Sequence, residues 1–215
     1  GQSIKELQRL IVTSSVYRQG SQHAAKNQLI DNNNQYLWRM NRRRLSAEEI
    51  RDSILRATGL LNDTQGGPGF YLFKLEHPQH SPHYEYHKYD PTNPLSYRRA
   101  VYRFVVRSQP DPYMTILDCA DSSQSTPLRD ETITSIQALA LLNNKFNLAM
   151  AERFAESLQQ ESPDIVDQVR IAFSRMTGRL PTSEEQSEFE QYAREHNVEN
   201  LCRILFNLNE FIYLD

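Results

Sequence analysis

Apolar residues recur every three or four positions near both ends of the chain, whereas the middle shows no such period. In the first part, this spacing predicts a helix that starts at Ile4 and is closed at Gly20, and a second helix over residues 46–59. Each helix begins with a serine followed three positions later by a glutamate, which is the capping-box pattern. Between the two helices, residues 21–35 are polar and are predicted to form a loop after a weak helical patch.

The last third of the chain is predicted to be strongly helical. From Thr134, apolar residues keep helical spacing through about six turns, as far as Phe154. Ser162 and the proline after it predict the start of the next helix, because proline is favoured at the first helical position. This helix is predicted to end at Gly178, and two further periodic segments follow, so residues 163–215 are predicted to form a three-helix unit. Thr134 with Gln137 and Thr182 with Glu185 show the capping-box pattern.

Prolines interrupt the middle of the chain, residues 62–130, and exclude a long helix there. Residues 70–75 and 100–106 are rich in aromatic or β-branched side chains, so we predict a small hairpin between them, with a short helix over 100–106 as the alternative. The predicted fold is mainly α: a multi-helix domain with a small irregular β-hairpin and a C-terminal three-helix unit. We assign residues 1–161 to a main helical domain and 162–215 to a subdomain packed on it.

The distribution of charge along the chain adds more to this prediction than the overall composition does. The net charge of the 215-residue chain is only −3, so nucleic acid is not an expected partner. However, residues 1–147 carry a balance of +4 and residues 148–215 a balance of −7. We interpret this as a basic front docked against an acidic tail, with separate charged partner surfaces as the alternative. No apolar run approaches the roughly 20 residues of a membrane span, and the first residues lack the pattern of a signal peptide. Because the chain begins almost directly in a predicted helix, we expect a piece of a longer protein.

Arginine outnumbers lysine 19 to 5, and eight arginines form two clusters, at 39–44 and 98–107. Guanidinium groups bind carboxylate, sulfate or phosphate in a bidentate manner, which would suit an anion-binding surface. The interpretation that we favour is a scaffold centred on Trp38, in which these arginines pair with Glu48, Glu49 and other carboxylates, including those of the acidic tail. The candidate anion- or partner-binding residues are Arg39, Arg42, Arg43, Arg98 and Arg99.

Other residues that could carry chemistry are few. Four histidines lie within eleven residues and could hold a metal, but prolines interrupt them, so we predict a solvated loop and no metal. The loop carboxylates of Asp118 and Asp121 are the only basis for a hydrolase hypothesis, because the common catalytic motifs are absent. Cys119 and Cys202 lack any CxxC or CxxCH spacing, so we predict no cofactor; pairing and two free thiols both remain open. The four histidines are His77, His80, His83 and His87.

Several ordered segments carry a resemblance to a known family. One combines Trp38 with the arginines around it, and the others occur at similar order and spacing through nearly the whole chain. Together they resemble the C-terminal domain of unknown function of large planctomycete-type surface proteins, which often also carry a cytochrome c-like module. The matching segments are Tyr17–Gln19, Tyr36–Leu45, Gly66–Pro68, Arg98–Tyr102, Leu117–Asp118, Gln137–Asn143, Gly178–Thr182 and Asn209–Phe211.

The resemblance implies a periplasmic, secreted or cell-surface location, since haem is attached covalently outside the cytoplasm. We therefore expect a non-catalytic structural or interaction module of a larger protein. Its expected partners are the rest of its own polypeptide, other cell-surface proteins or polysaccharide. A polyanion-binding module that recognises sulfated or acidic polysaccharide is the alternative, and a hydrolase is the third hypothesis.

Overall fold

A computed structural model describes residues 2–77, 79 and 81–214 of the chain. The chain forms two compact units, one made of Gly1–Arg44 with Tyr213–Asp215 and the other of Leu45–Ile212. We call them unit 1 and unit 2. The chain as a whole is mainly helical, which confirms the predicted fold class. Residues 45–161 and 162–212 both lie in unit 2, so the division into units does not test the predicted subdomain boundary at 161/162. That boundary stays a prediction.

Unit 1 contains two short helices and one small sheet. Helix α1 spans Ile4–Thr13, helix α2 spans Ala25–Ile30, and strands β1 (Arg43–Arg44) and β4 (Tyr213–Leu214) pair antiparallel. The serine at position 3 caps α1, but the helix ends at residue 13 and does not continue to Gly20 as predicted. Ser14 ends it, because its hydroxyl bonds back to the carbonyl of Ile11 at 2.7 Å.

The loop between α2 and β1 is built around the buried side chain of Asp31. Its carboxylate accepts hydrogen bonds from the backbone N–H groups of Gln35 (2.9 Å) and Tyr36 (2.7 Å). Its backbone carbonyl accepts one from the indole of Trp38 at 2.9 Å. Trp38 is therefore an anchor of this loop, and the guanidinium of Arg39 lies 5.4 Å from the centre of its ring.

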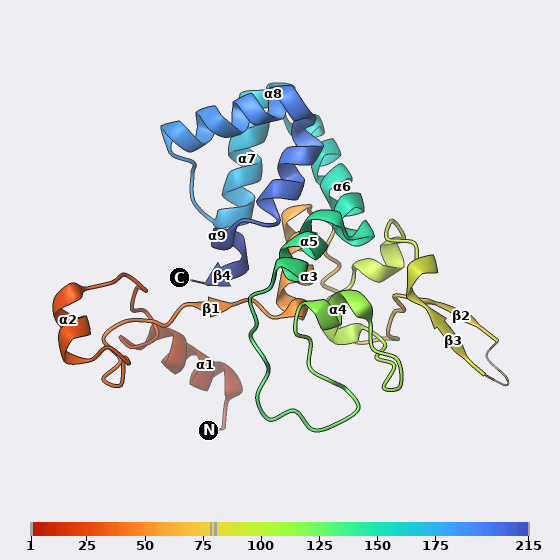
Figure 1. Ribbon diagram of the computed structural model, residues 1–215, viewed down its shortest axis with the longest axis horizontal. Coiled ribbons are helices and arrows are strands. Elements are labelled where there is room, and N and C mark those ends of the chain that lie inside the picture. Colours follow the sequence, from red (N-terminus) through yellow and green to blue (C-terminus); the bar gives the residue numbers. More distant parts are fainter. Residues whose placement is uncertain (1, 78, 80, 215) are drawn as a thin grey trace. The chain divides into compact units, whose positions relative to one another are not determined.

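Unit 2 begins with helix α3 (Ala47–Ala57), whose capping box is formed by Ser46 and Glu49 as predicted. The following helices are α4, α5, α6, α7, α8 and α9 (Figure 1). Three of them, α6, α7 and α8, pack against one another, and α3 packs against both α6 and α7. In chain order, helices α4 to α9 span Pro112–Ile116, Ser135–Asn143, Lys145–Glu161, Ile165–Thr177, Ser183–Leu205 and Asn209–Ile212.

Large apolar side chains fill the space between these helices. Phe154 of α6 and Phe206, just after α8, are both 0% exposed, and their rings are stacked 6.3 Å apart. Helix α7 ends at Gly178, which adopts the left-handed conformation (φ 78°) that favours glycine. Asn197 (φ 71°) interrupts α8, so this element consists of two helical segments, in agreement with the two periodic segments predicted after Gly178.

The break between α5 and α6 was not predicted. The sequence indicates one helix from Thr134 to Phe154, but Asn144 leaves the helical conformation and its side chain caps α6 by accepting from the N–H of Phe146 at 2.9 Å. The start of α7 also differs, because Asp164 and not Ser162 is its cap. In both cases a short polar side chain satisfies the N–H groups that a new helix leaves unpaired.

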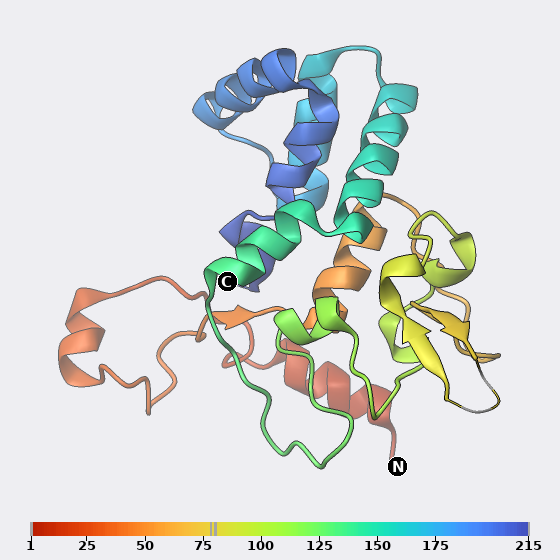
Figure 2. The same cartoon turned by 45° about the vertical axis from the view of Figure 1, so that its right-hand side comes forward.

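The predicted hairpin between 70–75 and 100–106 is wrong in its pairing. Strand β2 (Lys74–Glu76) pairs instead with β3 (His83–Glu85), as Figure 2 shows. Residues 100–102 form one of three short 3-10 helices, which is the alternative that we left open. The two predicted segments do meet, through a parallel bridge in which Phe70 donates to Tyr102 and accepts from Phe104, and through the ring of Phe104, which contacts Tyr71. The 3-10 helices are η1 (Tyr86–Lys88), η2 (Pro94–Tyr97) and η3 (Ala100–Tyr102).

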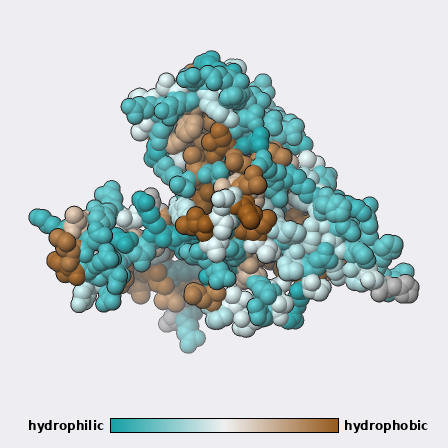
Figure 3. All heavy atoms as spheres, viewed as in Figure 1, coloured by the Kyte–Doolittle hydropathy of each residue, from teal (hydrophilic) through white to brown (hydrophobic). Residues whose placement is uncertain are grey.

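Among the residues that the structure describes, no helix is both long and apolar enough to cross a membrane. Apolar side chains do reach the surface, and the space-filling view shows a group of them around α5 (Figure 3). Two residues of that helix, Ile136 and Leu139, are 63% and 59% exposed.

An arginine and two glutamates join the ends of the C-terminal helices. Arg179, after α7, contacts the carboxylate of Glu185 in the first turn of α8 at 2.7 Å and that of Glu210 in α9 at 2.6 Å. Glu185 also accepts from the backbone N–H of Thr182, as the predicted capping box requires. These hydrogen bonds, with Arg179 the largest contributor, lower the pKa of Glu185 to about 2.

Glu185→Gln should therefore destabilise unit 2 at neutral pH and have less effect in acid. Because the pKa of this carboxyl is lower in the folded state, its contribution is present above the ordinary value of 4.5 and is lost as the pH falls towards about 2. The partly exposed pair should contribute no more than about 1 kcal/mol. Urea unfolding of both proteins between pH 7 and pH 2.5 measures the difference. Glu184→Gln, one position earlier on α8, is the control, and an equal gap at both pH values would contradict the assignment.

Candidate functional site

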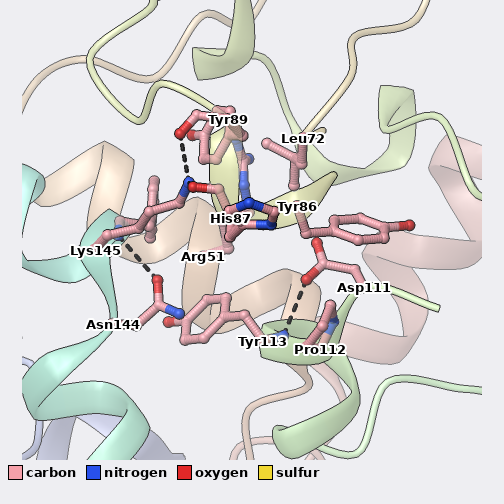
Figure 4. Close-up of a pocket in the computed structure, with 11 residues that line it drawn as sticks. Arg51, Leu72, Tyr86, His87, Tyr89, Asp111, Pro112, Tyr113, Asn144 and Lys145 are labelled. Atoms are coloured by element: carbon pink, nitrogen blue, oxygen red, sulfur yellow. Dashed lines mark hydrogen bonds between the residues drawn. The ribbon is translucent and has the colours of Figure 1, made fainter. Parts of the chain in front are cut away.

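Unit 2 contains a cavity of about 260 Å³ between α3, α4, the start of α6 and the segment around η1. Aromatic rings form much of its wall, and three charged side chains, Arg51, Asp111 and Lys145, reach it (Figure 4). None of these three was among the predicted site residues. The remaining lining residues are Leu72, Tyr86, His87, Tyr89, Pro112, Tyr113, Asn144 and Phe146.

Arg51 is the most deeply placed of the charged residues, with only 1% of its surface exposed. It lies on the inner face of α3, and its guanidinium donates to the backbone carbonyls of Ser96 and Arg98 and contacts the carboxylate of Asp52 at 3.3 Å. The ring of Phe146 lies 5.3 Å from the guanidinium. Arg51 thus ties the helix to the loop around η2.

Burial disfavours the charged forms of both Arg51 and Asp52. Desolvation lowers the pKa of Arg51, and it raises the pKa of Asp52 by more than the N–H of Ala100 and the charge of Arg51 lower it. Asp52 nevertheless accepts two hydrogen bonds from the N–H of Ala100, at 2.8 and 3.0 Å. A buried ion pair of this kind is sustained by such additional hydrogen bonds.

Asp111 supplies the acidic group of the cavity. It precedes Pro112 as the cap of α4, and its Oδ1 accepts from the backbone N–H groups of Tyr113 (3.0 Å) and Met114 (3.4 Å). Among the described residues, none donates a hydrogen bond to its Oδ2, which faces the cavity (Figure 4). Burial raises the pKa of Asp111, which is only 7% exposed, although Arg103 and the two amides oppose the shift.

Tyr113 connects α4 to the break between α5 and α6. Its hydroxyl donates to the side-chain oxygen of Asn147 at 2.9 Å, and the amide of Asn147 donates to the carbonyl of Leu141 at 2.7 Å. Asn147 is 0% exposed, so these bonds satisfy polar groups that would otherwise be buried without partners. Burial raises the pKa of Tyr113, which keeps the ring neutral.

Lys145, the first residue of α6, supplies the accessible cation. Its ammonium donates to the carbonyls of His87 (2.9 Å) and Tyr89 and lies 4.9 Å from the centre of the Tyr89 ring. An ammonium has three N–H groups, and within the described part of the chain only these two carbonyls accept from it. Desolvation lowers the pKa of Lys145, so an anion beside it would be stabilised by a charge that water screens only partly.

Two further tyrosines of the cavity wall are fixed by contacts of their hydroxyls. Tyr86 donates to the carbonyl of Gln109 at 2.8 Å, and Tyr89 lies 3.3 Å from the hydroxyl of Ser96. Burial raises the pKa of both phenols, that of Tyr86 to about 12. Their rings are therefore neutral, fixed surfaces against which a flat apolar face can pack.

The five predicted arginine positions are divided between the two units. Arg39, Arg42 and Arg43 belong to unit 1, and Arg98 and Arg99 belong to unit 2, so neither unit contains all five. Arg99 is exposed. Their use as an anion- or partner-binding surface stays a prediction.

Arg98 has a structural role that its cluster did not indicate. Its guanidinium donates to the backbone carbonyls of Thr64 (3.1 Å), Gly66 and Pro68, and it lies 4.0 Å from the centre of the Tyr102 ring. It therefore holds the glycine-rich turn through carbonyl oxygens and not through carboxylates.

Two of the predicted carboxylate partners are held by arginines outside the clusters. Glu48 pairs with Arg129 at 2.6 Å, and Asp52 pairs with Arg51. Glu48 also accepts a hydrogen bond from the thiol of Cys119, at 3.5 Å. Glu48 and Asp52 are thus paired with Arg129 and Arg51, and the scaffold role of the clustered arginines stays a prediction.

The histidine stretch is described only in part, because His80 lies outside the described residues. The rings of His77 and His83 are 5.8 Å apart, and His87 lies 3.1 Å from Glu85. Among residues 2–77, 79 and 81–214, no group of three or more potential metal ligands occurs.

The loop carboxylates considered for hydrolysis bind nearby backbone and side-chain groups of the loop and of α5. Asp118 accepts from the N–H of Thr132 at 2.7 Å and from the amide of Gln137 at 3.1 Å. Asp121 accepts from the N–H of Ser123 at 2.8 Å, which lowers its pKa. The structure also shows both cysteines as free thiols, so it favours that alternative over pairing.

Comparison with known families gives a match that covers most of the chain. Residues 1–193 match the family model PSD1, described as a protein of unknown function (DUF1553). The chain belongs to the PSD1 family. No curated protein and no solved structure matches it. The match includes every residue that lines the cavity, so the cavity lies within the PSD1 region.

Proposed function

We propose that this PSD1 domain is a non-catalytic interaction module of a larger secreted or cell-surface protein, and that the cavity beside Lys145 is its recognition site. One observation carries the proposal: two polar groups in an aromatic cavity have hydrogen-bonding capacity left over. They are the third N–H of Lys145 and the Oδ2 of Asp111. Sites for small ligands typically combine apolar walls with a few such polar groups.

The fixed positions of these groups support binding. Lys145 is fixed by two carbonyls, Asp111 by the helix that it caps, and Tyr113 by a buried amide. Held in this way, the side chains lose little freedom when a ligand enters, and preorganisation of this kind favours affinity. We propose no cofactor. The partners that we propose are the remainder of the polypeptide and cell-surface proteins or polysaccharide, in line with the resemblance noted above.

Titration of the ¹⁵N-labelled chain with small probes tests this proposal. The probes are neutral monosaccharides, sugar acids, free amino acids and simple carboxylates. We expect at least one class to give saturable shifts confined to the amides near 86–89, 111–113 and 144–147. Incubation for days with the bound probe should leave the probe unchanged, because the module is proposed to be non-catalytic.

Lys145→Met serves as the site variant, with Lys74→Met on strand β2 as its matched control, since the Lys74 side chain is 64% exposed. The first should weaken binding of the active probe class and the second should not. If no class shifts these amides at millimolar concentration, or if both variants bind like the parent chain, the cavity is not the recognition site.

A further inference from the structure

We infer that the cavity holds one hydroxylated ring that bears a carboxylate, as in a uronic acid residue of an acidic glycan. This inference rests on the proposed function, because it names the ligand class of the same site. It differs from the anion-binding surface predicted from the arginine clusters, since neither Lys145 nor Asp111 belongs to those clusters.

Size and wall chemistry point to a single ring. The cavity volume of about 260 Å³ lies at or below the lower limit of sites for drug-sized ligands, roughly 300 Å³. Tyrosine and phenylalanine rings from three separate segments, at 86–89, 113 and 146, line it. The flat C–H face of a sugar ring packs well against such aromatic faces, while the hydroxyls at its edge remain available for hydrogen bonds.

The polar groups differ in what they need from a ligand. Lys145 and Asp111 lie on opposite sides of the cavity in Figure 4. The ammonium of Lys145 can only donate, so it calls for an acceptor, best an anion. The Oδ2 of Asp111 can only accept a hydrogen bond while the carboxyl is ionised, so it needs a donor. A ring with a carboxylate near Lys145 and a hydroxyl near Asp111 supplies both partners at once.

The surrounding charges favour a hydroxyl over an ammonium as the donor to Asp111. Arg103 and Arg51 are both near enough to lower the pKa of this carboxyl against the effect of burial. A second cation would add like-charge repulsion with these guanidinium groups. A neutral donor pairs with Asp111 without that repulsion, which disfavours free amino acids as ligands.

The test compares methyl glycosides of glucuronic and galacturonic acid with the matching neutral glycosides and with a sulfated monosaccharide, by NMR titration of the full chain. A hydrogen bond to a charged group stabilises a complex enough to change affinity by about tenfold or more. We therefore expect the uronates to bind at least about tenfold more tightly than the neutral sugars. We also expect Lys145→Met to remove that preference.

Asp111→Asn supplies an independent variant. Asparagine can still cap α4, since Asn and Asp are comparable caps, but it removes the negative charge that strengthens the hydrogen bond from the ligand hydroxyl. We expect this variant to weaken binding of uronates and neutral sugars alike by about tenfold. Asp164→Asn, a substitution at the cap of α7, is the matched control and should leave binding unchanged. If Lys145→Met fails to fold, the comparison of uronates with neutral sugars on the unchanged chain still tests the carboxylate assignment, and Asp111→Asn tests the contact with the hydroxyl.

The outcomes separate the inference from the proposed function. Equal affinity for uronates and neutral sugars, or tighter binding of the sulfated sugar, would overturn the carboxylate assignment while the recognition site stands. Binding of only amino acids or simple carboxylates would likewise overturn the inference alone. If none of the probes shifts the cavity amides, both proposals fall together.

Discussion

Replacing Arg51 by alanine should lower the free energy of unfolding of unit 2 by about 3–5 kcal/mol, the cost of removing one member of a buried ion pair. The guanidinium is only 1% exposed and donates to the carbonyls of Ser96 and Arg98. Its loss leaves those carbonyls short of a donor and Asp52 without its charge partner. It also empties space beside the ring of Phe146.

Urea unfolding followed by circular dichroism measures this loss, and Arg56→Ala on the same helix is the matched control. The ion pair of Arg56 with Asp63 is exposed, at 68% and 54% of the two side chains, so this substitution should cost less than about 1 kcal/mol. Arg51→Met keeps most of the volume, and it should recover the packing part of the loss but not the hydrogen bonds. A cost for Arg51→Ala no larger than that for Arg56→Ala would show that the guanidinium does not hold the helix to the η2 segment.

Arg51 also shows why sequence alone did not find the cavity. In the sequence it is one charged residue of a helix that contains Glu48, Glu49 and Asp52, and its neighbours suggest a solvated face. The arginine clusters at 39–44 and 98–107 were more conspicuous because their members are close in sequence. The cavity instead combines short segments and single residues separated by up to about a hundred positions, from Arg51 to Phe146. No local pattern marks such a combination.

Features that depend on local chemistry were predicted well. The capping boxes at Ser46, Thr134 and Thr182 and the left-handed end at Gly178 are all present. Each is settled by side chains within a few residues of the helix end. The asparagine break at 144 was missed because apolar residues keep their helical spacing on both sides of it.

The hairpin was mispredicted for a different reason. Short strands are stabilised mainly by cross-strand side-chain contacts, so composition alone does not choose the partner. In the structure, the ring of Phe73 packs against Tyr84 of β3 at 5.0 Å and against Tyr86 at 5.5 Å. These contacts favour the neighbouring strand over the more distant residues 100–106. They also place the η1 segment, which supplies Tyr86, His87 and Tyr89 to the cavity.

Replacing Phe154 by alanine is expected to cost about 3–5 kcal/mol, because a large ring is removed from a packed core that can collapse only partly. Phe154 is 0% exposed and stacks on Phe206 with an angle of 6° between the rings. Those two residues join α6 to the end of α8, and α6 begins with Lys145 of the cavity. A loosened α6 should therefore also raise amide exchange at its first turn.

The control is Phe104→Ala, since the Phe104 side chain belongs to the same residue type but is 46% exposed and touches Tyr71 at the surface. It should cost much less, roughly 1 kcal/mol for the lost aromatic contact. Both variants can be compared by urea unfolding followed by circular dichroism, and hydrogen exchange then locates the change along the chain. A similar cost for both substitutions would mean that the α6–α8 contact is not the centre of the unit 2 core. Lys145 would then be positioned mainly by the backbone carbonyls of His87 and Tyr89 and not by the helix that it begins.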